Sequence, residues 1–291
     1  MAFTQFSNVL NEYFYYWYVN NGQVIGFHYA QGTKQQNLST EIVKVLPVDF
    51  PDIEEQEKII KILSLQDKVI ELKEKLFAEK HRQKKYLMQQ LLTGKKRLSG
   101  FNDKWEYPYA KNIFRNIANK DHNGSLEVLS ATQDQGIIPR SQVEIDIKYD
   151  KSSLSGYKKV EAGNFVISLR SFQGDIEYSE HTGIVSPTYT VLAPCTLIVD
   201  MYYKQFFKSA DYILRLNTAV YGIRDGKQIS YDDFGRITIP YPPIEEQQAI
   251  AQVLTAADHE IELLQKDIDQ ERRKKKALMQ LLLTGIVRVN T

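Results

Sequence analysis

One stretch of the chain carries the residue types that a metal-dependent nuclease uses. Asp52 follows Pro51, and Glu71 and Lys73 come later in the same stretch, the order in which a large class of nucleases supplies two carboxylates and a lysine. Such carboxylates need neighbouring strands that bring them to one metal ion. Here both belong to one helical pattern, and at 1.5 Å per residue roughly 28 Å of helix separates Asp52 from Glu71. The spacing therefore excludes a shared metal site at these residues.

Other patterns that carry chemistry are incomplete. Residues 222–228 resemble a phosphate-binding loop, but only three residues separate its glycines, and Gln228 replaces the Ser or Thr that holds magnesium. Residues 241–244 keep the two prolines of an adenine methyltransferase motif without its amide or its aromatic residue. The histidines lie far apart and Cys195 is the single cysteine, which excludes a zinc cage and an internal disulfide. We therefore predict that the chain is not an enzyme and has no catalytic residue, no metal and no cofactor of its own.

The composition is that of an ordinary folded protein. The 291 residues include 37 Lys and Arg against 36 Asp and Glu, a formal net charge of +1. This balance gives no sign of a polyanionic partner, so any case for DNA must come from local arrangement. No signal peptide follows Met1, and no apolar run approaches the ~18 residues of a membrane span. Together with the single cysteine, these features predict a cytoplasmic protein that does not contact a membrane.

An internal repeat organises the chain. The first copy begins with Pro-Asp-Ile-Glu-Glu-Gln at residues 51–56 and ends with Leu-Met-Gln-Gln-Leu-Leu-Thr-Gly at residues 87–94. The second begins with Pro-Pro-Ile-Glu-Glu-Gln at residues 242–247 and ends with Leu-Met-Gln-Leu-Leu-Leu-Thr-Gly at residues 278–285. Matched residues, such as Met88 and Met279, are always 191 positions apart. The constant offset indicates a true repeat, and we name its two ends the helix-start motif and the helix-end motif.

Each copy of the repeat predicts one long helix. Asp52 can cap the first helix, with Glu55 three residues later as in a capping box, and Gly94 stands where a left-handed C-terminal residue is favoured. Apolar residues at three- and four-residue spacing predict one seam on each helix. The expected seams are Ile62, Leu65, Val69, Leu72 and Leu76 in the first helix, and Leu254, Ala257, Ile261, Leu264 and Ile268 in the second.

The two helices are expected to pair within the chain. About forty residues give a rod of roughly 60 Å, with too little apolar surface to be buried on all sides. The residues between the rods predict a separate domain, with strands at 165–169 and 189–192, glycine-marked turns, and aromatic helices within 201–215. A second aromatic segment, residues 12–18, stands at the matching place before the first rod. We predict an α+β fold whose long helices form an antiparallel coiled coil, with a generic coiled-coil protein as the alternative.

The repeated motifs and residues 163–174, Gly-Asn-Phe-Val-Ile-Ser-Leu-Arg-Ser-Phe-Gln-Gly, resemble the specificity subunits of type I restriction-modification systems. In that family two target-recognition domains each read half of a bipartite DNA site, and the paired helices separate them and dock two methyltransferase (M) subunits. The resemblance covers nearly all of the chain. It implies a non-catalytic subunit that binds double-stranded DNA, M subunits and, through these, restriction (R) subunits, with S-adenosylmethionine held by the M subunits.

In the terms of this family, the chain has four parts. Residues 1–51 are the C-terminal remnant of a first target-recognition domain, 52–97 the first spacer helix, 98–243 a complete target-recognition domain, and 244–291 the second spacer helix and tail. The short first part departs from the family pattern of two complete target-recognition domains. A chain with one complete domain would read only one half-site. Three explanations stay open: a homodimer, a fragment that supplies the missing part, or a silent, truncated cassette product. A scaffold that assembles partner subunits without reading DNA is the alternative function.

Seven residues are candidates for DNA contact: Arg170, Ser171, Gln173, Arg224, Lys227, Lys34 and Gln35. The first three lie in a loop after a predicted strand, where Arg and Gln suit bidentate contacts with guanine and adenine. The other four lie in polar turns that precede the two rods, where phosphate contacts are expected. Ordinary surface turns are the alternative for all seven. Basic runs at 80–85 and 272–276 favour interaction with the helix dipole over contact with DNA or the methyltransferase.

Overall fold

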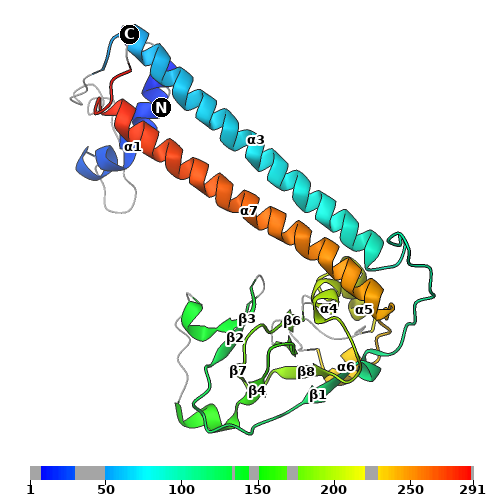
Figure 1. The fold of residues 1–291 in the computed structure, drawn as a ribbon. Coiled ribbons are helices and arrows are strands. Elements are labelled where there is room, and N and C mark those ends of the chain that lie inside the picture. The colour runs from blue at the N-terminus through cyan, green and yellow to red at the C-terminus, as the bar shows by residue number, and fades with distance from the viewer. Residues whose placement is uncertain are drawn as a thin grey trace. The chain divides into compact units, whose positions relative to one another are not determined.

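The structure is a computed structural model, and it forms two compact units (Figure 1). Unit 1 holds Met1–His81 and Glu260–Thr291, and unit 2 holds Arg82–His259. The divisions between the units fall inside two long helices, so each unit contains one end of each helix. The structure describes residues 8–29, 50–132, 135–143, 151–168, 176–219 and 229–289.

The two long helices, α3 (Ile53–Leu91) and α7 (Ile244–Leu283), lie where the repeat predicts them. The Asp52 carboxylate caps α3 by accepting a hydrogen bond from the Glu55 N–H at 2.9 Å. Beyond the other ends, Gly94 and Gly285 both have a φ of +70°, a left-handed conformation that glycine adopts without a Cβ clash. The predicted starts and ends of both helices are therefore confirmed.

The long helices run antiparallel within each unit. In unit 1, Ile59 near the start of α3 shares a buried cluster with Met279 near the end of α7. In unit 2, Leu91 at the end of α3 shares a buried cluster with Leu254 near the start of α7. Early residues of one helix thus meet late residues of the other, as the predicted antiparallel coiled coil requires.

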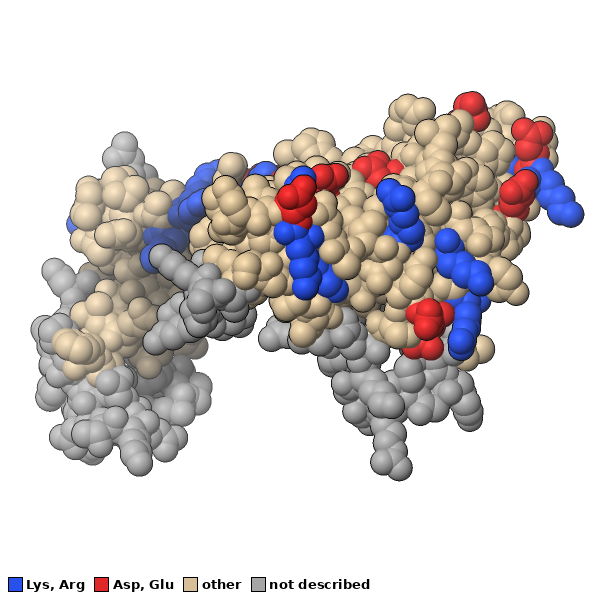
Figure 2. Space-filling model, turned by 90° about the horizontal axis from the view of Figure 1, so that it is seen from below, with Lys and Arg blue, Asp and Glu red and all other residues tan. Residues whose placement is uncertain are grey.

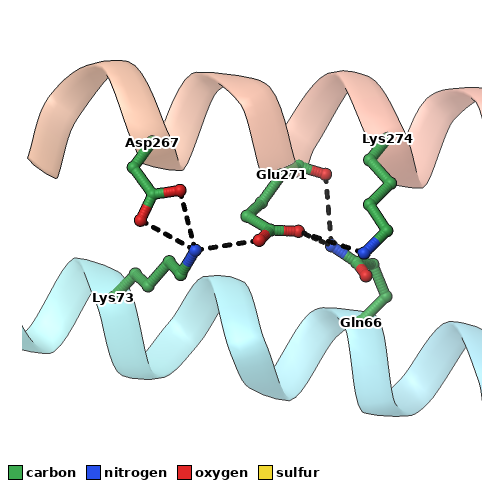
Figure 3. A network of polar contacts seen from close by, with 5 residues as sticks. All are labelled: Gln66, Lys73, Asp267, Glu271 and Lys274. Carbon is green, nitrogen blue, oxygen red and sulfur yellow. Dashed lines mark hydrogen bonds and ion pairs between the residues drawn. The ribbon is translucent and has the colours of Figure 1, made fainter.

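A polar network joins the two helices in unit 1 (Figure 3). Lys73 Nζ lies 2.8 Å from both Asp267 Oδ2 and Glu271 Oε1. Gln66 Nε2 donates to Glu271 Oε2 at 2.7 Å, and Lys274 Nζ lies 3.8 Å from the same oxygen. The hydrogen bonds to Asp267 and Glu271 raise the pKa of Lys73, and those from Lys73 and Gln66 lower the pKa of Glu271. Charged groups therefore help to pair the helices where a coiled coil usually has apolar ones.

The seam predicted for α7 is confirmed, whereas the seam predicted for α3 is wrong. Leu254, Ile261 and Ile268 of α7 are buried. On α3, four of the five predicted residues are exposed: Leu65 at 60%, Val69 at 38%, Leu72 at 53% and Leu76 at 47%. We name these four residues the outer strip.

Polar residues are the reason for this error. The α3 residues that meet α7 are Ile59, Leu63, Gln66, Lys73, Lys80, Lys84 and Leu91. They are the repeat equivalents of α7 residues 250, 254, 257, 264, 271, 275 and 282, of which 250, 254, 271, 275 and 282 also meet α3. Because Gln66 and three lysines occupy these positions on α3, its pairing seam has no continuous apolar pattern. Hydrophobic spacing alone therefore selected the neighbouring strip.

Unit 2 contains an antiparallel sheet of four strands in the order β1-β8-β5-β6. Its strands are β1 (Phe114–Ile117), β8 (Thr190–Pro194), β5 (Phe165–Ile167) and β6 (Glu177–Tyr178). In register, Phe165 faces Leu192 on one side and Tyr178 on the other. Two-stranded sheets pair β2 (Leu129–Thr132) with β3 (Gly136–Pro139), and β4 (Lys158–Val160) with β7 (Gly183–Val185).

Hydrophobic cores cover both faces of the four-stranded sheet. On one face, Phe114 and Phe165 pack with aromatic residues such as Phe207, at ring-centroid distances of 5.5 Å and 5.3 Å. The helices on this face are α4 (Asp200–Phe206), α5 (Ala210–Ala219) and α6 (Tyr231–Gly235). On the other face Val166 and Val191 pack against the two-stranded sheets. Short 3₁₀ helices occupy Ala110–Asn112, Arg140–Gln142 and Lys151–Gly156. Unit 2 is thus a mixed helix and sheet domain, as predicted.

The helix α1 (Asn11–Tyr29) of unit 1 occupies the repeat positions of α4 and α5 of unit 2. Tyr16 Oη of α1 donates to Asp67 Oδ2 of α3 at 2.8 Å. In unit 2, Gln205 Nε2 of α4 donates to Asp258 Oδ2 of α7 at 2.6 Å. Asp67 and Asp258 are matched positions of the repeat, so each long helix holds an aromatic-rich helix by the same carboxylate.

In each unit, a glutamate of one helix-start motif binds an arginine that lies three residues after the helix-end motif of the other repeat. In unit 2, Arg97 Nε and Nη2 donate to the two carboxylate oxygens of Glu246, both at 2.6 Å. In unit 1, Arg288 makes the same pair with Glu55 at 2.8 Å and 2.5 Å. Glu55 therefore does not complete the predicted capping box. Since Glu246 is fully buried and Glu55 is 3% exposed, both carboxylates depend on their arginine.

Removing the buried carboxylate of unit 2 should destabilise the protein most. Glu246→Ala leaves Arg97 and the Trp105 N–H, which donates to Glu246 at 2.7 Å, without their acceptor. We expect a loss of about 3–5 kcal/mol in the free energy of unfolding. Glu55→Ala should cost less, because the Arg288 side chain is 66% exposed and the Arg97 side chain is 26% exposed. Urea unfolding with Glu54→Ala as the exposed control checks this, and equal losses in all three variants would contradict it.

The polar network of Figure 3 predicts that the stability of the protein decreases at acidic pH. The pKa of Glu271 is lowered from 4.5, first by the hydrogen bond from Lys73. Its stabilising effect is therefore complete above about pH 4.5 and is lost as the pH falls through the lower, folded-state pKa. Below pH 4.5 the melting temperature of the native protein should fall more steeply with pH than that of Glu271→Gln. Glu245→Gln, at an exposed site on the same helix, serves as the control and should keep the native slope.

Candidate nucleic-acid interface

The seven residues predicted to contact DNA lie outside the described residues. They are Lys34, Gln35, Arg170, Ser171, Gln173, Arg224 and Lys227. The described elements nonetheless fix where these segments attach to the fold. Residues 169–175 join the end of β5 to β6, and residues 220–228 join α5 to Ile229. Their role in DNA contact stays a prediction.

An ion pair fixes the base of the 169–175 segment. Glu177, the first residue of β6, is 4% exposed, and its Oε1 accepts a hydrogen bond from Lys208 Nζ at 2.6 Å. Lys208 lies between α4 and α5, so this contact joins the edge of the sheet to the helical layer. A buried carboxylate needs such a partner, because an unpaired charge away from water is costly. The strand that follows the candidate loop is therefore tied to the helical layer.

The turn between β2 and β3 lies beside the same strand. Gly136 has a φ of +75°, and a Cβ atom built on it would lie 2.7 Å from the Tyr178 carbonyl oxygen. A bridge between Ile137 and Ser179 continues this contact. Two connections of the domain, residues 133–135 and 169–175, thus leave from neighbouring points of one sheet edge.

Tyr178 has a structural role in unit 2. Its Oη donates to Asp200 Oδ2 at 2.5 Å, and Lys204 Nζ lies 5.2 Å from its ring centroid. Burial first and the hydrogen bond to Asp200 second raise the pKa of Tyr178 above its usual range. Lys204 also pairs with Glu180 at 2.7 Å. This cluster joins β6 to α4 and orients the end of the sheet.

A basic corner, formed by Lys120 and Lys158, lies at the start of β4. Lys158 Nζ donates to the Tyr189 carbonyl at 2.6 Å, and the backbone N–H of Lys159 donates to the Asn119 carbonyl at 2.7 Å. Burial first and the charge of Lys120 second lower the pKa of Lys158. An anion beside these two lysines would reverse this effect by favouring the charged form. Lysines of this corner are suited to contact a phosphate, and Lys159 beside them already pairs with Glu161 at 2.9 Å.

Hydroxyl groups stand beside this corner. Ser186 Oγ and Thr188 Oγ1 lie 2.7 Å apart in the turn before Tyr189, whose N–H donates to the Ser186 carbonyl at 3.0 Å. Hydroxyls and lysines are the usual donors to nucleic-acid phosphates. The sequence analysis missed Lys120 and Lys158. The available signal was the run of donors and turn residues at 119–125, Asn-Lys-Asp-His-Asn-Gly-Ser.

Charge on the surface is mixed in sign. Figure 2 shows Lys and Arg side chains separated by Asp and Glu on the described part of one face. This pattern agrees with the net charge of +1. Attraction to a polyanion would thus depend on local groups such as the basic corner, because no broad positive field stands out on this described surface.

The two basic runs serve the pairing of the helices. Lys80 pairs with Glu260, and Lys84 with Asp258, while Arg272 pairs with Glu74 and Lys275 with Asp67. Neither α3 nor α7 has a basic residue in its last turn, so the helix-dipole interpretation of these runs is wrong. Acidic partners on the opposite helix account for Lys80, Lys84, Arg272 and Lys275 instead.

The residues considered for nuclease chemistry have structural roles. Asp52 caps α3, and Glu71 within α3 forms ion pairs with Lys68 at 3.0 Å and Lys75 at 2.5 Å. Their placement on one helix agrees with the exclusion of a shared metal site. Within the described residues, no group of three or more His, Cys, Asp or Glu side chains could hold a metal ion. None of the described helices has the length and apolar character needed to span a membrane.

A model of one protein family matches most of the chain. A model described as "Type I restriction modification DNA specificity domain" matches residues 1–82 and 93–271. The chain therefore belongs to this family, and the resemblance found in the repeated motifs is confirmed. The match includes the described residues of the basic corner and of the sheet edge.

Curated relatives share the family. A putative type I restriction enzyme MjaX specificity subunit of Methanocaldococcus jannaschii is 28% identical over 281 residues, which is 90% of this chain and 64% of the relative. The MjaVIII specificity subunit of the same organism is 47% identical over 53 residues, or 18% of this chain and 12% of the relative. The chain thus spans less than two thirds of the length of either relative.

Solved structures share the fold. The HsdS subunit from Thermoanaerobacter tengcongensis matches with a TM-score of 0.53 and 18% identity, over 96% of this chain and 71% of that one. The type I restriction-modification S subunit from M. genitalium matches with a TM-score of 0.58 and 17% identity, over 97% and 74%. These matches extend over both units and therefore support the α+β fold with paired long helices.

Adding one methyl group at Gly136 should disturb the sheet edge. Gly136→Ala places Cβ 2.7 Å from a backbone oxygen that cannot move easily, in addition to the strain of a positive φ. Gly100→Ala carries only the strain, since its φ is +91° and no atom lies within 4 Å of the added Cβ. We expect Gly136→Ala to lower the free energy of unfolding by about 1–3 kcal/mol more than Gly100→Ala. Equal losses in chemical unfolding would show that the β2–β3 turn does not pack against β6.

Proposed function

We propose that this chain is a non-catalytic DNA specificity subunit of a type I restriction-modification enzyme. Unit 2 reads one half of a DNA site, and the paired helices dock methyltransferase subunits. The observation that carries the proposal is the agreement between the family match and the fold, in which one mixed helix and sheet domain is built on two repeat-related helices. This chain covers 64% of the MjaX relative, so the activity of a whole specificity subunit is part of what we propose for it.

The geometry of unit 2 supports a role in DNA reading. Its sheet edge anchors the flanking residues of two connections, and Arg170, Ser171 and Gln173 belong to one of these connections. Side chains of these types can read base edges in the major groove. The basic corner of Lys120 and Lys158 would supply phosphate contacts that position the domain without reading sequence. Lys34, Gln35, Arg224 and Lys227 are further proposed phosphate contacts.

We assign the catalytic steps to partner subunits. Methyl transfer would belong to the methyltransferase subunits, which would hold S-adenosylmethionine, and cleavage to restriction subunits bound through them. This chain would act as a cytoplasmic adaptor that fixes where its partners meet DNA. A second copy of the chain is a further proposed partner, because unit 2 contributes one reading domain per chain.

The salt dependence of DNA binding tests the basic corner. Each lysine that neutralises a phosphate steepens the dependence of log K on log salt by about one. Lys120→Gln and Lys158→Gln should each reduce this slope by about 1 and weaken binding to every duplex alike. Lys104→Gln, at an exposed lysine of unit 2, is the control and should keep the native slope. An unchanged slope in both variants would remove the corner from the interface.

Competition between duplexes tests sequence reading itself. The chain is mixed with a methyltransferase subunit and a pool of random duplexes, and bound DNA is selected and sequenced. Enrichment of a common half-site that Arg170→Ala or Gln173→Ala relaxes at one position supports the proposal. Binding that is sensitive to salt but blind to sequence, or no binding, would favour the scaffold function.

A further inference from the structure

A half-buried histidine joins a loop of unit 2 to the strand β4. His122 Nε2 lies 2.9 Å from the Tyr157 carbonyl oxygen, and the Gly124 N–H donates to His122 Nδ1 at 3.1 Å. A carbonyl can only accept a hydrogen bond, and a backbone N–H can only donate one. The two contacts therefore need a neutral imidazole with its proton on Nε2, because an imidazolium has no atom left to accept from Gly124.

This histidine makes one of two contacts that bracket the basic corner. The carbonyl that it binds belongs to the residue before Lys158. The N–H of Lys159, on the other side of Lys158, donates to the Asn119 carbonyl at 2.7 Å. On the loop, Asn119 and His122 lie on either side of Lys120. Each lysine of the corner thus lies between two residues that are hydrogen-bonded to the opposite segment.

The strand side of this junction is fixed by the core, whereas the loop side is fixed by hydrogen bonds. The Tyr157 side chain packs in a buried cluster with Val128 and Ile184, and its N–H donates to the Leu154 carbonyl at 3.0 Å. Around His122 the loop residues are exposed. They are Asn119, Lys120, Asp121 and Asn123. Because these side chains bury no apolar surface, the contacts of His122 and Asn119 set the position of the loop.

The bracketed lysines carry like charges that repel each other. Burial first, and then the charge of Lys120, lower the pKa of Lys158. Within the described part of the chain, neither lysine forms an ion pair with a carboxylate. The nearby carboxylates act on Lys159, whose pKa is raised first by the hydrogen bond to Glu161 and also by the charge of Asp121. Hydrogen bonds thus hold two cations together, and one anion between them would relieve the repulsion.

We propose that His122 is a positioning residue for DNA binding, whose neutral Nε2–H form holds the loop on β4 so that Lys120 and Lys158 reach one phosphate of the duplex. The proposal rests on the proposed function for the identity of the anion. His122 does not need to touch DNA, because both ring nitrogens are already bonded. Holding the lysines in place beforehand removes the cost of ordering their loop when DNA binds. The affinity of unit 2 for any duplex thus depends on an uncharged side chain.

The salt dependence of DNA binding by the full chain tests this role, with duplexes of random sequence as the probe. His122→Ala frees the loop, so Lys120 leaves the phosphate and the slope of log K against log salt should fall by about 1. His122→Gln should keep the native slope, because its amide can donate to the Tyr157 carbonyl in place of Nε2. His259→Ala, at an exposed histidine in the same unit, is the matched control and should also keep the native slope.

Combined variants show whether His122 acts through Lys120. In the native background, Lys120→Gln should reduce the slope by about 1. In the His122→Ala background the same change should have little further effect, because the phosphate contact is already lost. Equal effects of Lys120→Gln in the two backgrounds would show that the residues act independently, and would overturn the proposal.

Two NMR measurements read the same positioning without DNA. Nitrogen spectra of the native chain should show a neutral His122 with its proton on Nε2. In His122→Ala the pKa of Lys158, followed at its side-chain carbon, should rise because Lys120 moves away. A native slope together with a native Lys158 pKa in His122→Ala would overturn the proposal and leave DNA binding by the corner intact. If Lys120→Gln and Lys158→Gln both keep the native slope, the corner is not in the interface, and the proposal fails with that part of the proposed function.

Discussion

Two buried carboxylates hold the protein together, Glu246 with Arg97 and Glu55 with Arg288. Each carboxylate belongs to the helix-start motif of one repeat, and each arginine follows the helix-end motif of the other. A carboxylate out of water must have its cation, so the start of one long helix must lie beside the end of the other. This requirement sets antiparallel pairing, and it explains why both motifs occur in both copies.

The same motif also attaches the neighbouring elements. Gln56 and Gln247 are fully buried, and each donates from Nε2 to the carbonyl of the motif proline, Pro51 or Pro242, at 2.8 Å. Their Oε1 atoms accept from the backbone N–H of Leu10 and Val199, which precede α1 and α4. Each repeat thus carries a joint between a long helix and an aromatic-rich helix. In unit 2 that second helix packs on the sheet whose edge bears the candidate reading loop.

Much of this architecture could be predicted from the sequence, because repeated residues constrain it directly. The constant offset located both helices, Asp52 and Gly94 marked their limits, and the strands at Phe165 and Thr190 followed from apolar runs. The pairing seam of α3 could not be predicted, since Lys73, Lys80 and Lys84 occupy it and hydrophobic spacing pointed to the outer strip. The basic corner was missed because Lys120 and Lys158 are far apart in sequence and meet only through the fold. The predicted reading loops carry no regular spacing that would fix their geometry.

Electron paramagnetic resonance between two spin labels tests the antiparallel pairing most directly. Labels at Glu57 and Thr284, both exposed in unit 1, are placed in a chain with Cys195→Ser. The carboxylate–arginine pairs predict one narrow, short distance, set by the ~10 Å between packed helix axes and by the label arms. The distribution should broaden when Glu55 and Glu246 are both replaced by alanine. A native distance of ~54 Å, the roughly 36 residues of helix by which a parallel pairing would separate the labels, would contradict the account.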